Sequence, residues 1–177
     1  MQHPVQSKQT DGDDTSGNDS LVLNCDSRHK QMVREHKKVR SSRDLHGGDC
    51  FADSEELETA VSQYLQDKSS KTEVAARYGW LIRSWCVSGV TDFIFLFAET
   101  DFNELIGQWN VASAKSMNSM FSDAKEFDQD LSGWNVSNVE DFSFMFEDAV
   151  VFNGNVVNWK TSRARTMENM FFGASSF

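Results

Sequence analysis

The sequence predicts an α/β solenoid of short parallel strands and short helices, preceded by a helical cap and a disordered N-terminal tail. The main observation is a repeat of about 25 residues over the second half of the chain. Its tryptophans and the phenylalanine twelve residues after each of them are Trp85 and Phe97, Trp109 and Phe121, Trp134 and Phe146, and Trp159 and Phe171. Self-similarity at a fixed period of this length is typical of stacked repeat architectures. Two helix-capping patterns before the repeats predict the cap.

Residues 1–50 are predicted to be a disordered tail, because they are polar, almost free of aromatic residues and lack any sustained period. Residues 28–43 form a basic block within this tail. A solvated charge run is its simplest interpretation, and a nuclear-localisation signal, an anionic-surface patch or a kinase site are the alternatives. The mirrored spacings Cys25-x3-His29 and His46-x3-Cys50 could bind zinc but match no common zinc module.

Residues 53–80 are predicted to form the helical cap. Asp53 is a good N-cap, and Glu56 three residues later completes a capping-box pattern for a helix from about Ser54 to Gln66. Thr72 can cap a second, short helix through Tyr78, which Gly79 would end. We expect this helix pair to cover the open end of the first repeat, because stacked repeats need polar caps for solubility. A small recognition module is the alternative.

Four repeats are predicted, at residues 82–105, 106–130, 131–155 and 156–177. In the third repeat Trp134 and Val136 alternate with polar or small residues, which predicts a half-buried strand. From Val139 onward the apolar spacing becomes 3, 3, 1 and 3, which predicts a short helix. The residues at its predicted N-cap in the four copies are Asp92, Ser116, Asp141 and Thr166. The helical methionines are predicted to fill the core: Met117, Met120, Met145, Met167 and Met170.

The spacing Leu131-x2-Trp134-x-Val136 is similar to the core of leucine-rich repeats, and residues 124–146, A-K-E-F-D-Q-D-L-S-G-W-N-V-S-N-V-E-D-F-S-F-M-F, resemble the BspA-like bacterial surface repeat. Residues 56–93 resemble the segment that leads into this repeat in algal, diatom-type members. The resemblance implies a scaffold for ligand binding or adhesion, found in surface or secreted proteins. It implies no catalytic residues, because the family motif contains none.

Charge argues against nucleic acid as a partner of the repeats. The net charge is −10, and the 17 basic residues include only nine after residue 50, where 19 of the 27 acidic residues lie. Such a domain repels phosphate backbones. The N-terminus lacks the apolar region of a signal peptide, and no apolar run is long enough to span a bilayer, so the chain as written is expected to be intracellular. Three cysteines are too few for a disulfide framework, and Cys86 is expected to be a free thiol.

No enzyme, cofactor or metal site is predicted. All four histidines lie in the tail, which removes the usual general base from the repeats, and no glycine-rich phosphate loop is present. Asp128 and Asp130 could suggest calcium, but no calcium-binding loop motif accompanies them, so a solvated acidic loop is favoured. Asn135-Val136-Ser137 is a glycosylation sequon that has meaning only in a secreted chain.

The predicted function is a non-enzymatic scaffold for recognition of a protein or a surface ligand. Its candidate interaction face consists of the positions that flank each tryptophan: Gln108, Asn110, Gly133, Asn135, Asn158 and Lys160. One alternative is a regulatory adaptor that uses the basic block at 28–43. Another is a non-catalytic fragment of a larger protein, whose catalytic part would lie outside this sequence. The last repeat stops in mid-unit, which indicates a truncated sequence or a fragment, with end-to-end self-association at the uncapped C-terminal end as the alternative.

Overall fold

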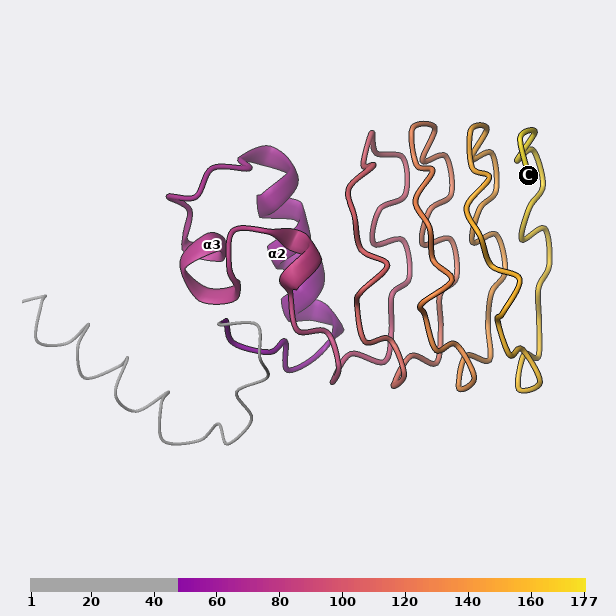
Figure 1. Cartoon of the computed structure of the whole chain (residues 1–177), viewed down its shortest axis with the longest axis horizontal. Helices are drawn as coiled ribbons and strands as arrows, with labels where there is room; N and C mark the ends of the chain where they lie inside the picture. The colour runs from indigo at the N-terminus through magenta and orange to yellow at the C-terminus, as the bar shows by residue number, and fades with distance from the viewer. Residues whose placement is uncertain (1–47) are drawn as a thin grey trace, which may run out of the picture. The chain divides into compact units, whose positions relative to one another are not determined.

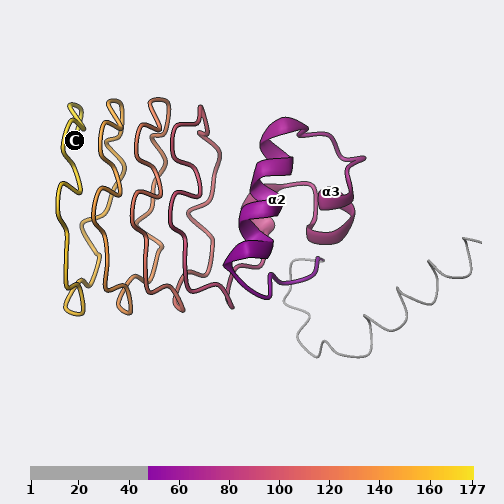
Figure 2. The same cartoon turned by 180° about the vertical axis from the view of Figure 1, so that it is seen from behind.

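The computed structural model describes residues 48–177, in which two α-helices precede a row of four similar coils (Figure 1). Helix α2 spans Ser54–Gln66, helix α3 spans Glu73–Tyr78, and η1 is a single 3-10 turn at Ile82–Ser84. The four coils lie side by side in both views (Figure 2). No helix among the described residues is long and apolar enough to cross a membrane. The basic block and the histidines lie outside the described residues.

Both predicted helices are confirmed, with the predicted caps. The Asp53 carboxylate accepts a hydrogen bond from the Glu56 backbone N–H at 2.9 Å, and the Glu56 carboxylate accepts one from the Ala52 N–H at 2.6 Å. The Thr72 hydroxyl caps α3 by accepting from the Ala75 N–H, and Gly79 ends it with φ +95°. The buried residues of α2 form one apolar stripe: Leu57, Ala60, Val61 and Tyr64.

The predicted fold class was wrong. Residues 48–177 contain no β-strand and no sheet, and the repeats contain no α-helix. Parallel pairing is limited to isolated bridges, which in the repeats join Asp92 to Ser116, Ser116 to Asp141, and Asp141 to Thr166. These four residues are the ones that the sequence assigned to helix N-caps. They instead begin four runs of consecutive turns, at 92–99, 116–123, 141–148 and 166–173, which we call the turn rows.

Each turn row is hydrogen-bonded to the next by every second residue. The backbone N–H groups of Met117, Ser119, Phe121 and Asp123 donate to the carbonyls of Asp141, Ser143, Met145 and Glu147 at 2.8–2.9 Å. The first and second rows, and the third and fourth rows, are joined in the same way. Within the turn rows these bonds all run in one direction, from an N–H group of one repeat to a carbonyl of the next.

The turn rows also explain why a helix was predicted. Within the third row, Met145 N–H donates to Phe142, Glu147 to Phe144, and Ala149 to Phe146, each three residues back. Linked turns of this kind bring residues three or four apart to the same side, as a helix does, so the apolar spacing is the same for both structures. The residues with positive φ at the third position of a turn are Phe95, Glu99, Ser119, Asp123, Phe144, Asp148, Asn169 and Gly173. Only Gly173 is glycine, so the usual glycine signal of such turns is absent at the other seven positions.

The tryptophans tie each repeat to the one before it, in the short stretches around them (105–111, 130–136 and 155–161) that we call the Trp segments. The indole Nε1–H of Trp109 donates to the Ile82 carbonyl at 2.8 Å, and that of Trp134 to the Ile106 carbonyl at 3.0 Å. Trp159 donates to Leu131 in the same way. Trp85, Trp109 and Trp134 are at most 4% exposed, so the predicted burial of these three is confirmed.

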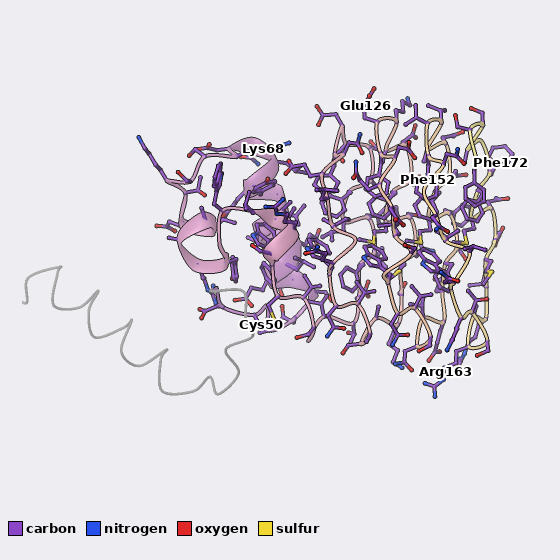
Figure 3. All side chains as sticks on the ribbon, in the orientation of Figure 1. Cys50, Lys68, Glu126, Phe152, Arg163 and Phe172 are labelled. Carbon is purple, nitrogen blue, oxygen red and sulfur yellow. A yellow bond between two sulfur atoms is a disulfide. The ribbon has the colours of Figure 1, made fainter. Side chains whose placement is uncertain are left out.

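Two columns of stacked phenylalanine rings run through the core of the repeats. In the first, Phe97, Phe121, Phe146 and Phe171 stack with ring centroids 5.4–5.6 Å apart. The second column consists of Phe102, Phe127, Phe152 and Phe177. Figure 3 shows Phe152 among the neighbouring side chains of this row. Four of the five predicted core methionines are buried, whereas Met167 on the fourth repeat is 41% exposed.

A disulfide joins Cys50 to Cys86, so the prediction that Cys86 is a free thiol was wrong. The bond is set by the backbone, because Cys50 and Cys86 form a parallel bridge and the Phe51 N–H donates to the Cys86 carbonyl at 3.0 Å. Phe51 is buried and stacks on Tyr78. Residues 48–50, which the sequence assigned to the tail, therefore lie against α3 and the first repeat. The pairing also removes Cys50 from the suggested zinc set.

Candidate functional site

All six residues of the candidate interaction face are exposed, and they lie at corresponding places in the Trp segments of three consecutive repeats. Gln108, Gly133 and Asn158 occupy one position, and Asn110, Asn135 and Lys160 occupy the other. These stretches are turns and irregular backbone, not the strands on which the sequence placed them. The residues are brought together by the stacking of the repeats.

Asn110 and Asn135 each hold a turn as well as facing solvent. The Asn110 side-chain oxygen accepts a hydrogen bond from the Ala112 N–H, and that of Asn135 accepts one from the Ser137 N–H, both at 3.2 Å. An Asn side chain that bonds the backbone two residues on stabilises a turn locally. The amide NH2 group of each makes no hydrogen bond with the described residues, so it stays available as a donor. This dual use was not expected from the sequence.

Gly133 is required by the close approach of neighbouring repeats. A Cβ atom at this position would lie 2.9 Å from the Gly107 carbonyl oxygen, and one at Gly107 would lie 2.4 Å from that of Asp130. Real Cβ contacts are essentially never shorter than 3.0 Å. Gly133 therefore offers only its backbone to a ligand, and the neighbouring side chains provide the hydrogen-bonding groups of the face.

Gln108, Asn158 and Lys160 carry the uncommitted polar groups of the face. None of the three side chains forms a hydrogen bond or an ion pair with the residues that the structure describes. Together with the NH2 groups of Asn110 and Asn135, they offer mainly hydrogen-bond donors and one positive charge. Such a face suits a ligand with carbonyl, hydroxyl or carboxylate oxygens.

Asp128 and Asp130, the two residues considered for calcium, serve the backbone. The Asp128 carboxylate accepts from the Asn153 N–H at 2.8 Å, one repeat further on, and the Asp130 carboxylate accepts from the Ser132 N–H at 2.8 Å. The hydrogen bonds from Ser132 lower the pKa of Asp130. Among the described residues, no group of three or more His, Cys, Asp or Glu side chains could hold a metal ion.

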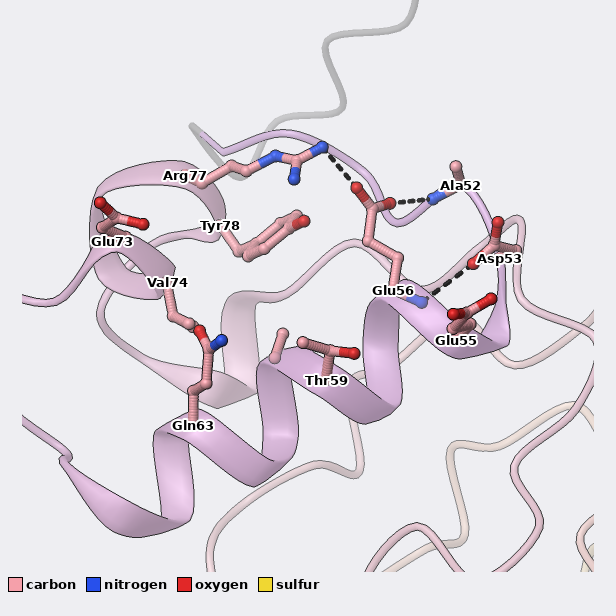
Figure 4. Close-up of a pocket in the computed structure, with 11 residues that line it drawn as sticks. Ala52, Asp53, Glu55, Glu56, Thr59, Gln63, Glu73, Val74, Arg77 and Tyr78 are labelled. Atoms are coloured by element: carbon pink, nitrogen blue, oxygen red, sulfur yellow. Dashed lines mark hydrogen bonds and ion pairs between the residues drawn. The ribbon is translucent and has the colours of Figure 1, made fainter.

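A hollow of about 480 Å³ lies between α2 and α3 (Figure 4). Its most prominent polar groups stabilise the helices, because the Arg77 guanidinium pairs with the Glu56 carboxylate and Asp53 caps α2. The remaining lining is acidic or neutral, with Glu55, Glu73 and polar side chains. The hollow therefore belongs to the packing of the two helices, and nothing in it points to a reaction.

The sequence missed one exposed apolar spot. Ile94 and Phe95 in the first turn row are 40% and 62% exposed, beside a hollow of about 300 Å³ that Ser54 and Glu58 of α2 also line. The corresponding pairs in the later repeats are Asn118 and Ser119, Ser143 and Phe144, and Glu168 and Asn169. A comparison of the copies could have found this spot, because only the first repeat is apolar at both positions.

A buried tyrosine joins the helices to the repeats. The Tyr64 hydroxyl donates to the Glu104 carboxylate at 2.6 Å, and Lys68 pairs with the same carboxylate at 2.9 Å. Burial, followed by the hydrogen bond and the charge of Glu104, raises the pKa of Tyr64. The Tyr64 ring also packs edge-on against Trp85 at 5.4 Å. These contacts hold α2 on the first repeat.

The sequence of the repeats matches the model of the family described as "Mycoplasma protein of unknown function, DUF285" over residues 59–177. The chain belongs to this family. DUF285 is a BspA-like repeat family, so the predicted resemblance is confirmed at that level. The match begins within α2 and includes all four repeats. No curated protein and no solved structure gives a significant match.

Proposed function

We propose that this DUF285 chain is a non-enzymatic scaffold that recognises a protein or a surface ligand through the Trp segments of its second to fourth repeats. The observation that carries the proposal is the exposed row of Gln108, Asn110, Asn135, Asn158 and Lys160 on repeats that are locked together. Because the aromatic columns and the backbone ladder fix the repeats, the row is ordered before it meets a ligand. Preorganisation lowers the entropic cost of binding.

The disulfide supports a place of action outside reducing compartments. Disulfides form and persist in oxidising surroundings and are rare in the cytosol. The Cys50–Cys86 bond closes a loop over α2 and α3, so oxidation would stabilise the part of the molecule that covers the first repeat. A surface or secreted location agrees with the BspA-like family and with the resemblance to algal, diatom-type members. Asn135 is exposed, and a glycan on its sequon would use the side-chain nitrogen and cover the proposed face, so the proposal requires Asn135 to be unglycosylated.

The test uses variants that change the face and keep its turns. Asn110→Asp and Asn135→Asp retain the side-chain oxygen that accepts the turn hydrogen bond but lose the NH2 donors, and Lys160→Ser removes the charge. The triple variant and the unchanged chain would be applied to arrays of glycans and of extracellular proteins. We expect the unchanged chain to bind a defined set of targets and the triple variant to bind them at least tenfold more weakly.

A matched control checks that the loss is local. Phe95→Ser changes the exposed apolar spot of the first repeat and leaves the Trp segments intact. If Phe95→Ser abolishes binding to these targets and the triple variant still binds them, the apolar spot is the recognition site and the proposed face is wrong. Equal binding by all three chains, or no target above the level of a reduced and unfolded chain, would exclude recognition by either surface.

A further inference from the structure

The candidate interaction face carries the same side-chain amide at the same position of two consecutive repeats. The side-chain oxygens of Asn110 and Asn135 each accept a hydrogen bond from the backbone N–H two residues further on, that of Ala112 or Ser137, at 3.2 Å. These bonds orient the two amides alike, and neither NH2 group forms a hydrogen bond with the described residues. Both asparagines are exposed although a repeat lies on each side of them, so a ligand can reach them whatever lies beyond the ends of the row.

The spacing of the repeats at the Trp segments matches an extended polypeptide. The Trp134 and Trp159 rings are 3° from parallel and their centroids are 6.4 Å apart, so the third and fourth Trp segments are related by nearly pure translation. The phenylalanine column of the turn rows is spaced more tightly, at 5.4–5.6 Å, so the repeats spread toward the Trp segments. An extended chain advances by about 3.3 Å per residue, or about 6.6 Å for two residues. Because alternate residues of such a chain direct their backbone N–H and C=O groups to the same side, the amides of successive repeats face every second residue of it.

The chemistry of the face also suits a peptide main chain. A primary amide has both donors and an acceptor, which pair with the C=O and N–H groups of a peptide bond. Asp130 is the only acidic residue of the three Trp segments, in a chain of net charge −10, and its carboxylate already accepts from the Ser132 N–H. Lys160 takes the place of the two asparagines in the fourth repeat and supplies a positive charge. The row therefore offers two amides followed by one cation.

We propose that the ligand of this face is an extended polypeptide segment that binds by its main chain along Asn110 and Asn135 and places a carboxylate at Lys160. The inference rests on the proposed function and names its ligand class. Hydrogen bonds to the main chain supply affinity without a requirement for particular side chains. The charged hydrogen bond between the carboxylate and Lys160 fixes the direction and the register of the segment.

The experiment starts from a displayed library of random linear peptides, which is selected against the full oxidised chain, and the strongest binder is synthesised. Its backbone N–H groups are replaced one at a time by N-methyl groups, and each dissociation constant is measured. We expect binding to be about tenfold weaker at two positions separated by one residue, and less than about twofold weaker at the residue between them. Conversion of the peptide carboxylate to an amide and Lys160→Ser should each weaken binding. The two losses should not add, because both remove the same ion pair.

Two asparagine variants and a matched control assign the contacts. Asn110→Asp and Asn135→Asp keep the oxygen that holds the turn and lose the NH2 donors, so each should weaken binding of the peptide about tenfold. Asn155→Asp makes the same change at another exposed asparagine, whose oxygen accepts from the Val157 N–H at 3.1 Å and whose place in the third repeat is taken by Asp130. This control should change binding less than about twofold.

The outcomes separate the ligand class from the function itself. If no selected peptide depends on the two asparagines, or if N-methylation at the middle residue weakens binding as much as on either side, the polypeptide ligand is wrong. Glycan targets that are lost in the triple variant, with no such peptide, would leave the proposed function in place and exclude this ligand class. The absence of any target that is sensitive to the triple variant would contradict both.

Discussion

A single side chain, the repeated tryptophan, links the sequence period to the stacking of the repeats. Trp134 fills the core and satisfies its N–H with the Ile106 carbonyl of the preceding repeat. A leucine at this position could supply the apolar surface but not the hydrogen bond. The tryptophan therefore fixes both the distance and the order of neighbouring repeats.

Replacement of this indole tests its role. Trp134→Phe should lower the free energy of unfolding by about 2–3 kcal/mol, since it loses one buried hydrogen bond and leaves a small cavity. Trp80→Phe is the control, because Trp80 also donates to a backbone carbonyl, that of Lys68, but is 55% exposed. It should cost less than about 1 kcal/mol in chemical denaturation. Equal losses would mean that the indole does not join the repeats.

At the residues of the turn rows with positive φ, we expect glycine to be more stable than alanine, the opposite of the order inside a helix. Glu99 has φ +58° and is exposed, a conformation that costs about 1–2 kcal/mol for any residue with a Cβ atom. Glu99→Gly should therefore be more stable than Glu99→Ala by roughly 1 kcal/mol. At Glu58 inside α2 the order should reverse by a similar amount. Thermal and urea unfolding of the four variants measure both differences. The same order of stability for Gly and Ala at Glu99 and at Glu58 would mean that the rows are not turns.

Tyr64 makes stability depend on alkaline pH. Its pKa is raised in the folded chain, so the folded state holds the phenolic proton more tightly than the unfolded state does. Its contribution is fully present below about pH 10, the ordinary value for tyrosine, and is lost as the pH rises above it. Urea denaturation at pH 8 and pH 11 should show a larger loss for the unchanged chain than for Tyr64→Phe. Equal losses would exclude Tyr64 as the cause.

At the scale of elements, the sequence predicted what local contacts determine. Helices α2 and α3 were predicted with their caps, because Asp53, Thr72 and Gly79 act within one helical turn. The buried residues of the repeats were also largely predicted, because their period is visible. Their secondary structure was not, since linked turns and a short helix share the 3–4 residue spacing, and the deciding hydrogen bonds join residues about 25 apart.

The sequence predicted that the candidate face is exposed, but it did not predict the contacts that its residues make. The alternation around Trp134 correctly placed Gly133 and Asn135 at the surface. The turn bonds of the asparagines and the crowding at Gly133 depend on how closely two repeats approach, which no pattern within one repeat reveals. The disulfide was missed for the same reason, because Cys50 and Cys86 are 36 residues apart and are brought together by the folded segment that contains α2 and α3.

The contribution of the Cys50–Cys86 disulfide to the free energy of unfolding can be measured. Closing a loop of this length restricts the unfolded chain and is typically worth about 2–4 kcal/mol. With Cys25→Ser as a background that prevents exchange with the third cysteine, reduction should lower the free energy of unfolding by that amount. A further Cys50→Ser and Cys86→Ser variant should be equally weakened and should not respond to reductant. A reductant effect in that variant would show that the disulfide is not the cause.

At the scale of the whole molecule, stability should depend on position along the row of repeats. When each repeat contacts only its neighbours, a central repeat has two interfaces and the fourth has one in this structure. Phe121 is completely buried between Phe97 and Phe146, whereas Phe171 stacks on Phe146 alone in its column and is only partly buried. The same substitution should therefore have unequal effects.

Phe121→Ala should cost about 3–5 kcal/mol, the usual range for a buried phenylalanine, and Phe171→Ala less than half of that. Denaturant unfolding gives both values, and amide exchange shows where each acts. Phe171→Ala should open residues 166–173 and leave the second turn row protected, whereas Phe121→Ala should weaken the rows on both sides of it. Similar costs, with protection lost across all four rows in both variants, would mean that the repeats unfold only as one unit.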